Sequence, residues 1–213
     1  MKVNEIFYSI QGESSFAGWP CVFVRLTGCN LRCSYCDTRY AYEEGEEMGI
    51  ADILEKVAGF SCLLVEITGG EPLFQEETPL LIRALLDKGY RVLLETNGSI
   101  DVSGVDDRCH RIIDVKLPQS GEAGRNRLEN LRLLTDKDEL KFVIGSREDY
   151  DYARKVIQLI PQGIAGVIVI NFSPLFAMIA PRLLAEWILE DRLPVRLNLQ
   201  LHKLIWPSAM RGV

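Results

Sequence analysis

Seven apolar runs alternate with more polar stretches along the chain. Most of these runs are continuously apolar, which is typical of strands that are buried on both faces of a parallel sheet. The runs that we predict as strands are residues 22–26, 62–68, 91–96, 111–115, 140–144, 166–170 and 195–201.

Helical patterns separate some of these strands. Residues 78–89 place leucines and isoleucine on one face and end at Gly89, a common helix terminator. Residues 146–160 carry a second apolar stripe, and Ser146 with Asp149 has the spacing of a capping box. Two helices are therefore predicted between strands.

The alternation of strands and helices indicates right-handed crossovers around one parallel sheet. Residues 99–110 and 119–130 are predicted as loops, so the alternation is incomplete. Six or so units fall short of the usual eight-unit barrel, which has about 250 residues. We therefore expect an α/β fold, an incomplete (β/α) barrel, formed by a single domain over residues 1–213. Its reactive site should lie at the carboxyl ends of the strands.

Composition and charge narrow the class of protein. The chain is 47% hydrophobic and 25% charged, which is ordinary for a globular enzyme. Its net charge of −6 argues against a nucleic-acid partner, because contact with a phosphate backbone needs an excess of Lys and Arg. The sequence has neither a membrane span nor the apolar stretch of a signal peptide, so we expect a cytoplasmic protein with six reduced cysteines.

Three cysteines stand close together after the predicted strand 22–26. Cys29, Cys33 and Cys36 have the spacing C-x3-C-x2-C, which suits three corners of an iron–sulfur cubane and leaves one iron open for a cofactor. The alternative is a zinc site, which needs a fourth protein ligand such as Cys109 or a histidine. The other three cysteines are expected to be small buried side chains: Cys21, Cys62 and Cys109.

The cysteine motif resembles the cluster motif of radical S-adenosylmethionine enzymes. The sequence Thr-Gly-Gly-Glu-Pro at residues 68–72 resembles the second signature of that family, which receives the methionine end of the cofactor. The resemblance implies a 4Fe-4S cluster that binds S-adenosylmethionine and reduces it to methionine and a 5′-deoxyadenosyl radical. The protein must then hold one substrate C–H bond against that radical.

Further segments resemble the 7-carboxy-7-deazaguanine synthase family over nearly the whole chain. These segments are residues 6–13, 22–26, 36–38, 95–98, 114–116, 139–143 and 199–203. The resemblance implies conversion of 6-carboxy-5,6,7,8-tetrahydropterin to 7-carboxy-7-deazaguanine with loss of ammonia, on the route to queuosine. It also implies Mg²⁺, a low-potential electron donor such as flavodoxin, and a homodimer.

The same resemblance assigns site residues. For the substrate these are Ile10, Gln11, Gly12, Glu13, Arg25, Thr68 and His202. For S-adenosylmethionine they are Gly70, Glu71, Asn97, Asp114, Val115, Lys116 and Ser173. The magnesium ligand would be Thr38.

Residue chemistry supports part of this assignment. The amide of Gln11 and the carboxylate of Glu13 can complement the donors and acceptors of an aminopyrimidinone ring. Arg25 interrupts an apolar strand, so it either faces solvent or presents a fork to the substrate carboxylate. In some relatives the terminal carboxylate contacts the substrate soon after the position of His202. Here residues 208–213 follow Pro207, so that contact is not carried over.

Two other functions fit parts of the sequence. One is an activase that abstracts hydrogen from a glycine of a partner protein, since it shares the cluster spacing and the compact size. The other is a zinc-binding interaction module without catalysis. The Gln11–Glu13 segment, Thr38 and His202 favour the pterin enzyme over the activase, whereas a zinc module would contain one zinc and show no charge-transfer absorbance.

Overall fold

One nine-stranded sheet forms the centre of the protein in a computed structural model that describes residues 1–207 and 210–213. The strands are β1 Lys2–Ile10, β2 Pro20–Leu26, β3 Glu46–Glu47, β4 Leu64–Gly69, β5 Arg91–Thr96, β6 His110–Asp114, β7 Glu139–Ile144, β8 Val169–Pro174 and β9 Arg196–Leu197. Their order is β3-β1-β2-β4-β5-β6-β7-β8-β9. From β2 to β9 every pairing is parallel, while β1 is antiparallel to both of its neighbours. The edge strands β3 and β9 do not pair with each other, so in the described residues the sheet does not close into a full barrel. The prediction of an incomplete barrel is confirmed.

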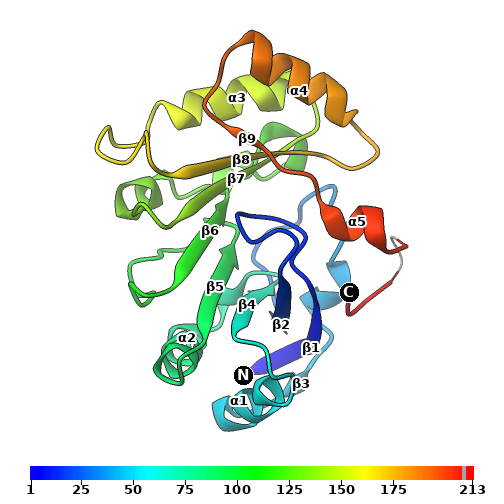
Figure 1. The fold of residues 1–213 in the computed structure, drawn as a ribbon, viewed down its shortest axis with the longest axis vertical. Helices are drawn as coiled ribbons and strands as arrows, with labels where there is room; N and C mark the ends of the chain where they lie inside the picture. The colour runs from blue at the N-terminus through cyan, green and yellow to red at the C-terminus, as the bar shows by residue number, and fades with distance from the viewer. Residues whose placement is uncertain (208–209) are drawn as a thin grey trace.

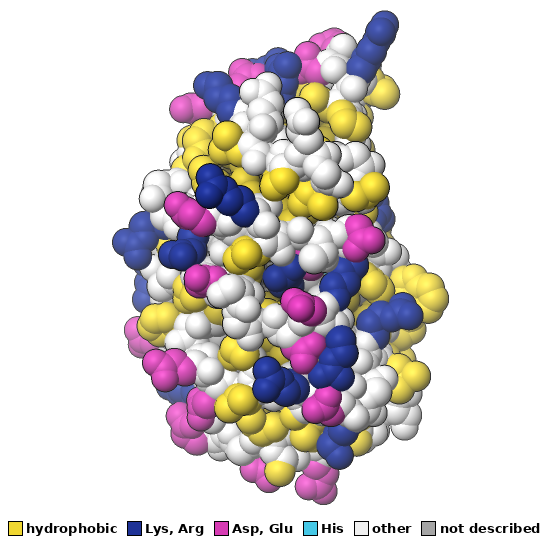
Figure 2. All heavy atoms as spheres, turned by 90° about the vertical axis from the view of Figure 1, so that its left-hand side faces the viewer, with side chains coloured by type: hydrophobic (Ala, Val, Ile, Leu, Met, Phe, Trp, Pro, Cys, Tyr) yellow, Lys and Arg dark blue, Asp and Glu magenta, His cyan; other side chains and the backbone are white. Residues whose placement is uncertain are grey.

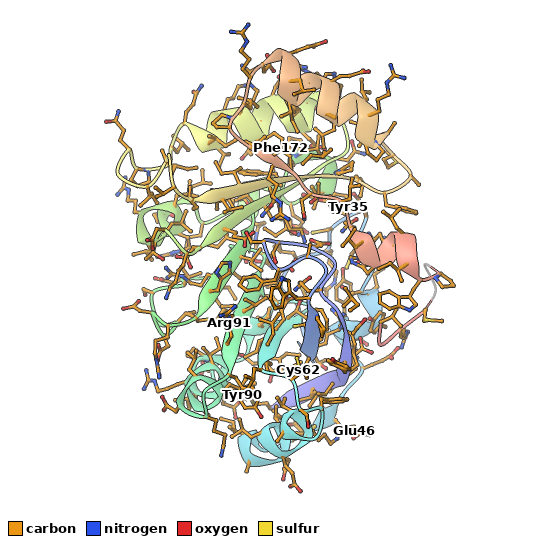
Figure 3. All side chains as sticks on the ribbon, viewed as in Figure 1. Tyr35, Glu46, Cys62, Tyr90, Arg91 and Phe172 are labelled. Atoms are coloured by element: carbon orange, nitrogen blue, oxygen red, sulfur yellow. The ribbon has the colours of Figure 1, made fainter. Side chains whose placement is uncertain are left out.

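Five α-helices accompany the sheet in the described residues: α1 Ile50–Ala58, α2 Thr78–Asp87, α3 Arg147–Ile157, α4 Pro181–Glu190 and α5 Leu201–Ile205. Figure 1 shows α1 and α2 at one end of the curved sheet, α3 and α4 at the other, and α5 beside the loop after β1. In Figure 3, Phe172 of β8 lies beneath α3 and α4, and its ring meets Tyr150 of α3 edge-on with centroids 5.7 Å apart. None of the described helices is long and apolar enough to cross a bilayer.

The strands present two chemically different faces, because successive side chains point to opposite sides of a sheet. On β4, Val65 and Ile67 belong to the large apolar core that includes side chains of the helices, whereas Glu66 and Thr68 face the cavity inside the curve. A second, smaller apolar cluster fills the inside of the curve near the amino ends of the strands and includes Phe23 and Leu93. The polar side chains of the cavity therefore lie on the inner face near the carboxyl ends.

The loop of residues 11–19 between β1 and β2 enters the curve of the sheet. The backbone N–H of Ser15 donates to the Glu139 carboxylate at 3.0 and 3.1 Å. That carboxylate also bonds to His110 at 2.8 Å and accepts from Asn171 Nδ2 at 2.6 Å. The loop is thus fixed to three strands on its way to the site.

Two of the predicted elements need correction. The run 195–201 is not a strand of that length, because only Arg196–Leu197 pairs with β8 and the chain then turns into α5. Contacts with the loop of residues 11–19, such as Leu201 N to Gly12 O at 3.0 Å, replace the strand pairing. The strand predicted at 166–170 lies at Val169–Pro174, and β1, α1 and α4 were not predicted.

The two predicted helices are confirmed with shorter bounds. Gly89 follows α2 with a φ of 87°, a conformation that glycine adopts without strain. The Ser146 hydroxyl caps α3 by accepting from Asp149 N at 3.2 Å. The reciprocal half of the predicted capping box is absent, since the Asp149 carboxylate accepts from Gly145 N and Gln119 N.

The connection from β6 to β7 contains no α-helix and is fixed to the sheet by a buried ion pair. Arg111 donates to Asp138 from Nε at 3.1 Å and from a terminal nitrogen at 2.5 Å. The Asp138 carboxylate also accepts from the backbone N–H and hydroxyl of Thr135, both at 2.8 Å. Burial opposes ionisation, but Arg111 outweighs it and lowers the pKa of Asp138.

We expect Asp138→Ala to lower the free energy of unfolding by about 3–5 kcal/mol, because it leaves a buried guanidinium without its partner. Because the folded pKa is lowered, the pair should contribute its stability above the unfolded pKa of about 3.9 and lose it as pH falls further. Urea titrations at pH 7 would measure the difference. Asp136→Ala, at an exposed position two residues away, is the matched control and should stay close to the parent protein.

Candidate active site

The loop after β2 carries the three clustered thiols to the carboxyl end of the sheet. Cys29, Cys33 and Cys36 are unpaired, half-buried, and all line the same cavity. Burial raises the pKa of Cys33 to about 11. In a cubane cluster each of three irons takes one thiolate. The three sulfur atoms therefore need to lie around the space of the whole cluster and not around a single metal ion.

The turn after β4 packs directly on this loop. A Cβ at Gly70 would lie 2.6 Å from Cys29 Cβ, so only glycine fits there. Next to it, the buried Glu71 carboxylate accepts from Thr96 Oγ1 at 2.8 Å and from Asn97 N at 2.6 Å. Glu71 therefore joins the ends of β4 and β5, and its raised pKa follows from burial.

A cavity of about 590 Å³ opens at this edge of the sheet. Its size suits a small-molecule ligand of several rings. The predicted residues that line it are Ile10, Gln11, Gly12, Glu13, Arg25, Thr68 and His202 for the substrate, Gly70, Asn97, Asp114 and Lys116 for the cofactor, and Cys29, Cys33, Cys36 and Thr38 for metals. Figure 3 shows Tyr35, of the cysteine loop, between the sheet and α5.

Three of the residues predicted for the cofactor do not line the cavity. The Glu71 carboxylate is committed to Leu73 N, Thr96 and Asn97. Val115 belongs to the apolar core on the other face of the sheet. Ser173 is fully buried, and its hydroxyl accepts from Asn198 Nδ2 at 3.4 Å.

Lys141 of β7 is a cavity residue that the sequence analysis did not single out. Its ammonium contacts Glu13, Glu95 at 2.6 Å and Asp114 at 3.7 Å. Burial opposes ionisation of Glu13, but Lys141 outweighs it and lowers the pKa of Glu13. Burial raises the pKa of Glu95 in spite of the same lysine. The sequence does contain a sign of Lys141, because a basic residue stands within an apolar strand there, as it does at Arg25.

Glu66 of β4 was also missed. Gln11 Nε2 donates to the Glu66 carboxylate, and Gln11 Oε1 accepts from Glu13 N at 2.9 Å. The amide of Gln11 is thereby fixed in orientation, with its oxygen towards Glu13 and its nitrogen towards Glu66. Burial raises the pKa of Glu66 well above the usual range, and Glu95 and Glu13 add to the effect.

Arg25 of β2 is largely shielded and lines the cavity, so the alternative that it faces solvent is wrong. Its side chain is 13% exposed, and Nε donates to Glu5 Oε1 at 2.8 Å. The Tyr40 hydroxyl donates to the same oxygen at 3.0 Å. Among residues 1–207 and 210–213, the terminal nitrogens of Arg25 make no recorded hydrogen bond, and Arg25 lines the cavity.

The end of the chain closes one side of the cavity. Gln200 Nε2 donates to Glu13 Oε1 at 2.6 Å, and Lys203 pairs with Asp37 at 2.7 Å. A Cβ at Gly12 would lie 3.0 Å from Cγ of His202. Burial lowers the pKa of His202, which favours a neutral imidazole. Of the segment 208–213 noted in the sequence, residues 208 and 209 lie outside the described part of the chain.

Thr38 lies on the cavity wall with its hydroxyl 3.7 Å from Cys36 Sγ. The zinc alternative lacks a fourth ligand at Cys109, which is buried in the apolar core on the other face of the sheet. His110 is engaged with Glu139 near the amino ends of the strands. Within the described ranges, no three His, Cys, Asp or Glu side chains are arranged to hold a single metal ion.

Comparison with known proteins agrees with this geometry. Residues 23–170 match the family model of the radical SAM superfamily. The chain is 51% identical to the 7-carboxy-7-deazaguanine synthase of Chlorobaculum tepidum, over 100% of this chain and 97% of the relative. It is 44% identical to the synthase of Koribacter versatilis over the full length of both.

Solved structures show the same fold. The crystal structure of QueE from Escherichia coli superposes with a TM-score of 0.72 at 23% identity, covering 93% of each chain. Streptococcus suis SuiB bound to its precursor peptide SuiA follows with a TM-score of 0.58 at 12% identity, covering 83% of this chain and 47% of that chain.

The fold, the cysteine loop and the family match define a radical SAM enzyme. That superfamily implies a 4Fe-4S cluster and S-adenosylmethionine, and the three thiols around one cavity fit the cluster. Within the superfamily, the chain belongs to the 7-carboxy-7-deazaguanine synthase family.

We expect Cys33→Ala to abolish cleavage of S-adenosylmethionine and to lower the iron content after anaerobic reconstitution, because one corner of the cluster loses its thiolate. Cys62→Ala is the control. Its Sγ donates to the backbone carbonyls of Pro20 and Leu64, and Cys62 does not line the cavity, so cleavage should persist. Full cleavage in Cys33→Ala would contradict the assignment.

Proposed function

We propose that this protein is a radical S-adenosylmethionine lyase that converts 6-carboxy-5,6,7,8-tetrahydropterin to 7-carboxy-7-deazaguanine and ammonia. One observation carries the proposal: a single cavity is lined by the cluster thiols, by the glycine turn after β4, and by the amide, carboxylate and guanidinium groups that suit a carboxylated pterin. The full-length relatives bear the name of this synthase, which favours it over a glycine-radical activase.

Cys29, Cys33 and Cys36 would hold the cluster, and Gly70, Asn97, Asp114 and Lys116 would hold S-adenosylmethionine. Together the cluster and S-adenosylmethionine would supply hydrogen-atom abstraction from the substrate. Lys116 donates to Asp114 at 2.9 Å. Burial opposes its charge, but Asp114 outweighs burial and raises the pKa of Lys116, so an ammonium is available for the cofactor carboxylate.

Other residues of the cavity wall would bind the pterin. Gln11 and Glu13 would address the aminopyrimidinone edge, and Thr68 and His202 line the same cavity. Arg25 is held through Nε by Glu5, which leaves its terminal nitrogens for the substrate carboxylate. Such a guanidinium binds a carboxylate with fixed geometry.

Thr38 would contribute one oxygen to Mg²⁺, with the substrate and water supplying the others. Magnesium prefers six oxygen ligands and commonly keeps several waters, so one protein hydroxyl is sufficient. Its charge would orient the pterin and stabilise negative charge during rearrangement.

The remaining features are proposed from the family and the sequence. They are a single domain over residues 1–213, a flavodoxin-like electron donor, a homodimer and a cytoplasmic location. Leu204 and Ile205 of α5 are exposed and offer apolar surface for a second copy. The face drawn in Figure 2 mixes basic and acidic side chains, in line with the expectation of no nucleic-acid partner.

The direct test is anaerobic reconstitution followed by incubation with the pterin, S-adenosylmethionine, a reductant and Mg²⁺. The proposal requires 7-carboxy-7-deazaguanine and ammonia in equal amounts from purified components. Cleavage of S-adenosylmethionine without either product would contradict it.

Arg25→Lys should raise KM for the pterin about tenfold, because an ammonium keeps the charge and loses the two-point geometry. Cleavage of S-adenosylmethionine in the absence of substrate should change much less. Steady-state kinetics with both readouts would check this, and unchanged KM would reject the role of Arg25.

Thr38→Ala should raise the Mg²⁺ concentration needed for half-maximal turnover about tenfold or more, because one inner oxygen is lost. The iron and sulfide content should stay at the parent level. A Mg²⁺ titration of product formation is the measurement, and an unchanged midpoint would rule out Thr38 as the ligand.

A further inference from the structure

The proposed function assigns no role to Glu66, a carboxylic acid that lines the cavity. Its side chain is 3% exposed and lines the cavity two residues before Thr68. In residues 1–207 and 210–213, its recorded side-chain contact is with Gln11, an amide without charge. No recorded ion pair in that part of the chain includes Glu66.

The charges around Glu66 favour its neutral form. The groups that face it from the packed elements are Glu95 on β5, Glu13 in the loop of residues 11–19, Lys141 on β7, and Arg25 and Cys21 on β2. Lys141 is already paired with Glu13 and Glu95, and Arg25 is paired with Glu5. A further carboxylate at this depth would be buried without a partner, which is costly. Burial, with Glu95 and Glu13, accordingly raises the pKa of Glu66.

The proposed reaction needs a proton inside the cavity. An amino group leaves carbon as ammonia only when it takes up a proton. A carboxylic acid on the cavity wall can supply it. The three acids that face Lys141, namely Glu13, Glu95 and Asp114, are less suited, because their oxygens already contact its ammonium.

We propose that Glu66 is the general acid for release of ammonia, an inference that rests on the proposed function. The Glu66 proton moves to the leaving nitrogen, and the C–N bond breaks with its electron pair on nitrogen, which departs as NH3. The electron pair of the adjacent C–H bond forms the new C=C bond, and that proton returns to the Glu66 carboxylate. Glu66 is restored, and the substrate loses one NH3.

Gln11 positions this acid. It donates to one Glu66 oxygen, which leaves the other oxygen to carry the proton. The same amide accepts from Glu13 N, so the acid and the residue proposed to bind the pterin edge are held in one arrangement.

The test is Glu66→Gln, a change of the same size that keeps an acceptor for Gln11 and removes the acidic proton. We expect ammonia release from 6-carboxytetrahydropterin to fall about 100-fold or more. Cleavage of S-adenosylmethionine that depends on the pterin should stay within about threefold. An isomer with the mass of the substrate, still carrying its amino nitrogen, should accumulate and be detected by mass spectrometry.

The pH profile gives an independent readout. In the parent enzyme, ammonia release should fall as pH rises and Glu66 ionises, and this limb should be absent from Glu66→Gln. Glu55→Gln is the control, since Glu55 is an exposed glutamate of α1 and does not line the cavity. This variant should still show the fall of ammonia release at high pH. Its rate of ammonia release should stay within about threefold of the parent rate.

Three results would overturn the inference: ammonia release at the parent rate in Glu66→Gln, an equal loss of pterin-dependent cofactor cleavage, or an equal loss of ammonia release in Glu55→Gln. The second result would make Glu66 a binding residue. Failure of the proposed function is distinguishable, because the parent enzyme itself would then release no ammonia from the pterin.

Discussion

The site depends on the compensation of buried charge in the cavity at the carboxyl ends of the strands. Lys141 faces three carboxylates, from the loop after β1, from β5 and from β6. Removing one charge from a buried cluster leaves the opposite charges without a partner, which destabilises the folded protein. The ammonium thus allows three separate chain segments to bring acids to one cavity. Since the substrate proposed for that cavity carries a carboxylate of its own, the cation also limits repulsion on entry.

The side chains of one strand divide between the apolar core and the cavity. On β7, Leu140 and Phe142 pack in the apolar core outside the curve, and Lys141 between them faces inward. Strand alternation therefore lets a single short run contribute to both stability and chemistry. Near the amino ends of the strands, the inward positions become apolar or bind the loop of residues 11–19. The cavity is consequently confined to the carboxyl ends, which is the usual position in folds of this class.

Local patterns revealed the parts of the protein that depend on local spacing. The cysteine loop and the glycine turn after β4 were recognisable because each motif lies within a few residues. Gln11 and Glu13 were predicted as pterin ligands, but their bonds to Glu66 and Lys141 come from strands far away in the sequence. Glu66 looked like an ordinary polar residue in an apolar run, since nothing in its neighbours indicates which face of the sheet it occupies. The run 195–201 was misread for the same reason, because contacts with residue 12 outweighed its strand-like alternation.

The bond between Gln200 and Glu13 joins residues that are 187 positions apart. A second bond beside it, from Leu201 N to Gly12 O at 3.0 Å, joins the same two segments through the backbone. The wall of the cavity formed by α5 and the loop of residues 11–19 therefore depend on each other for their positions. Displacement of α5 would remove one partner of Glu13 and leave Lys141 as the other. Two distant parts of the chain are thus coupled at the cavity itself.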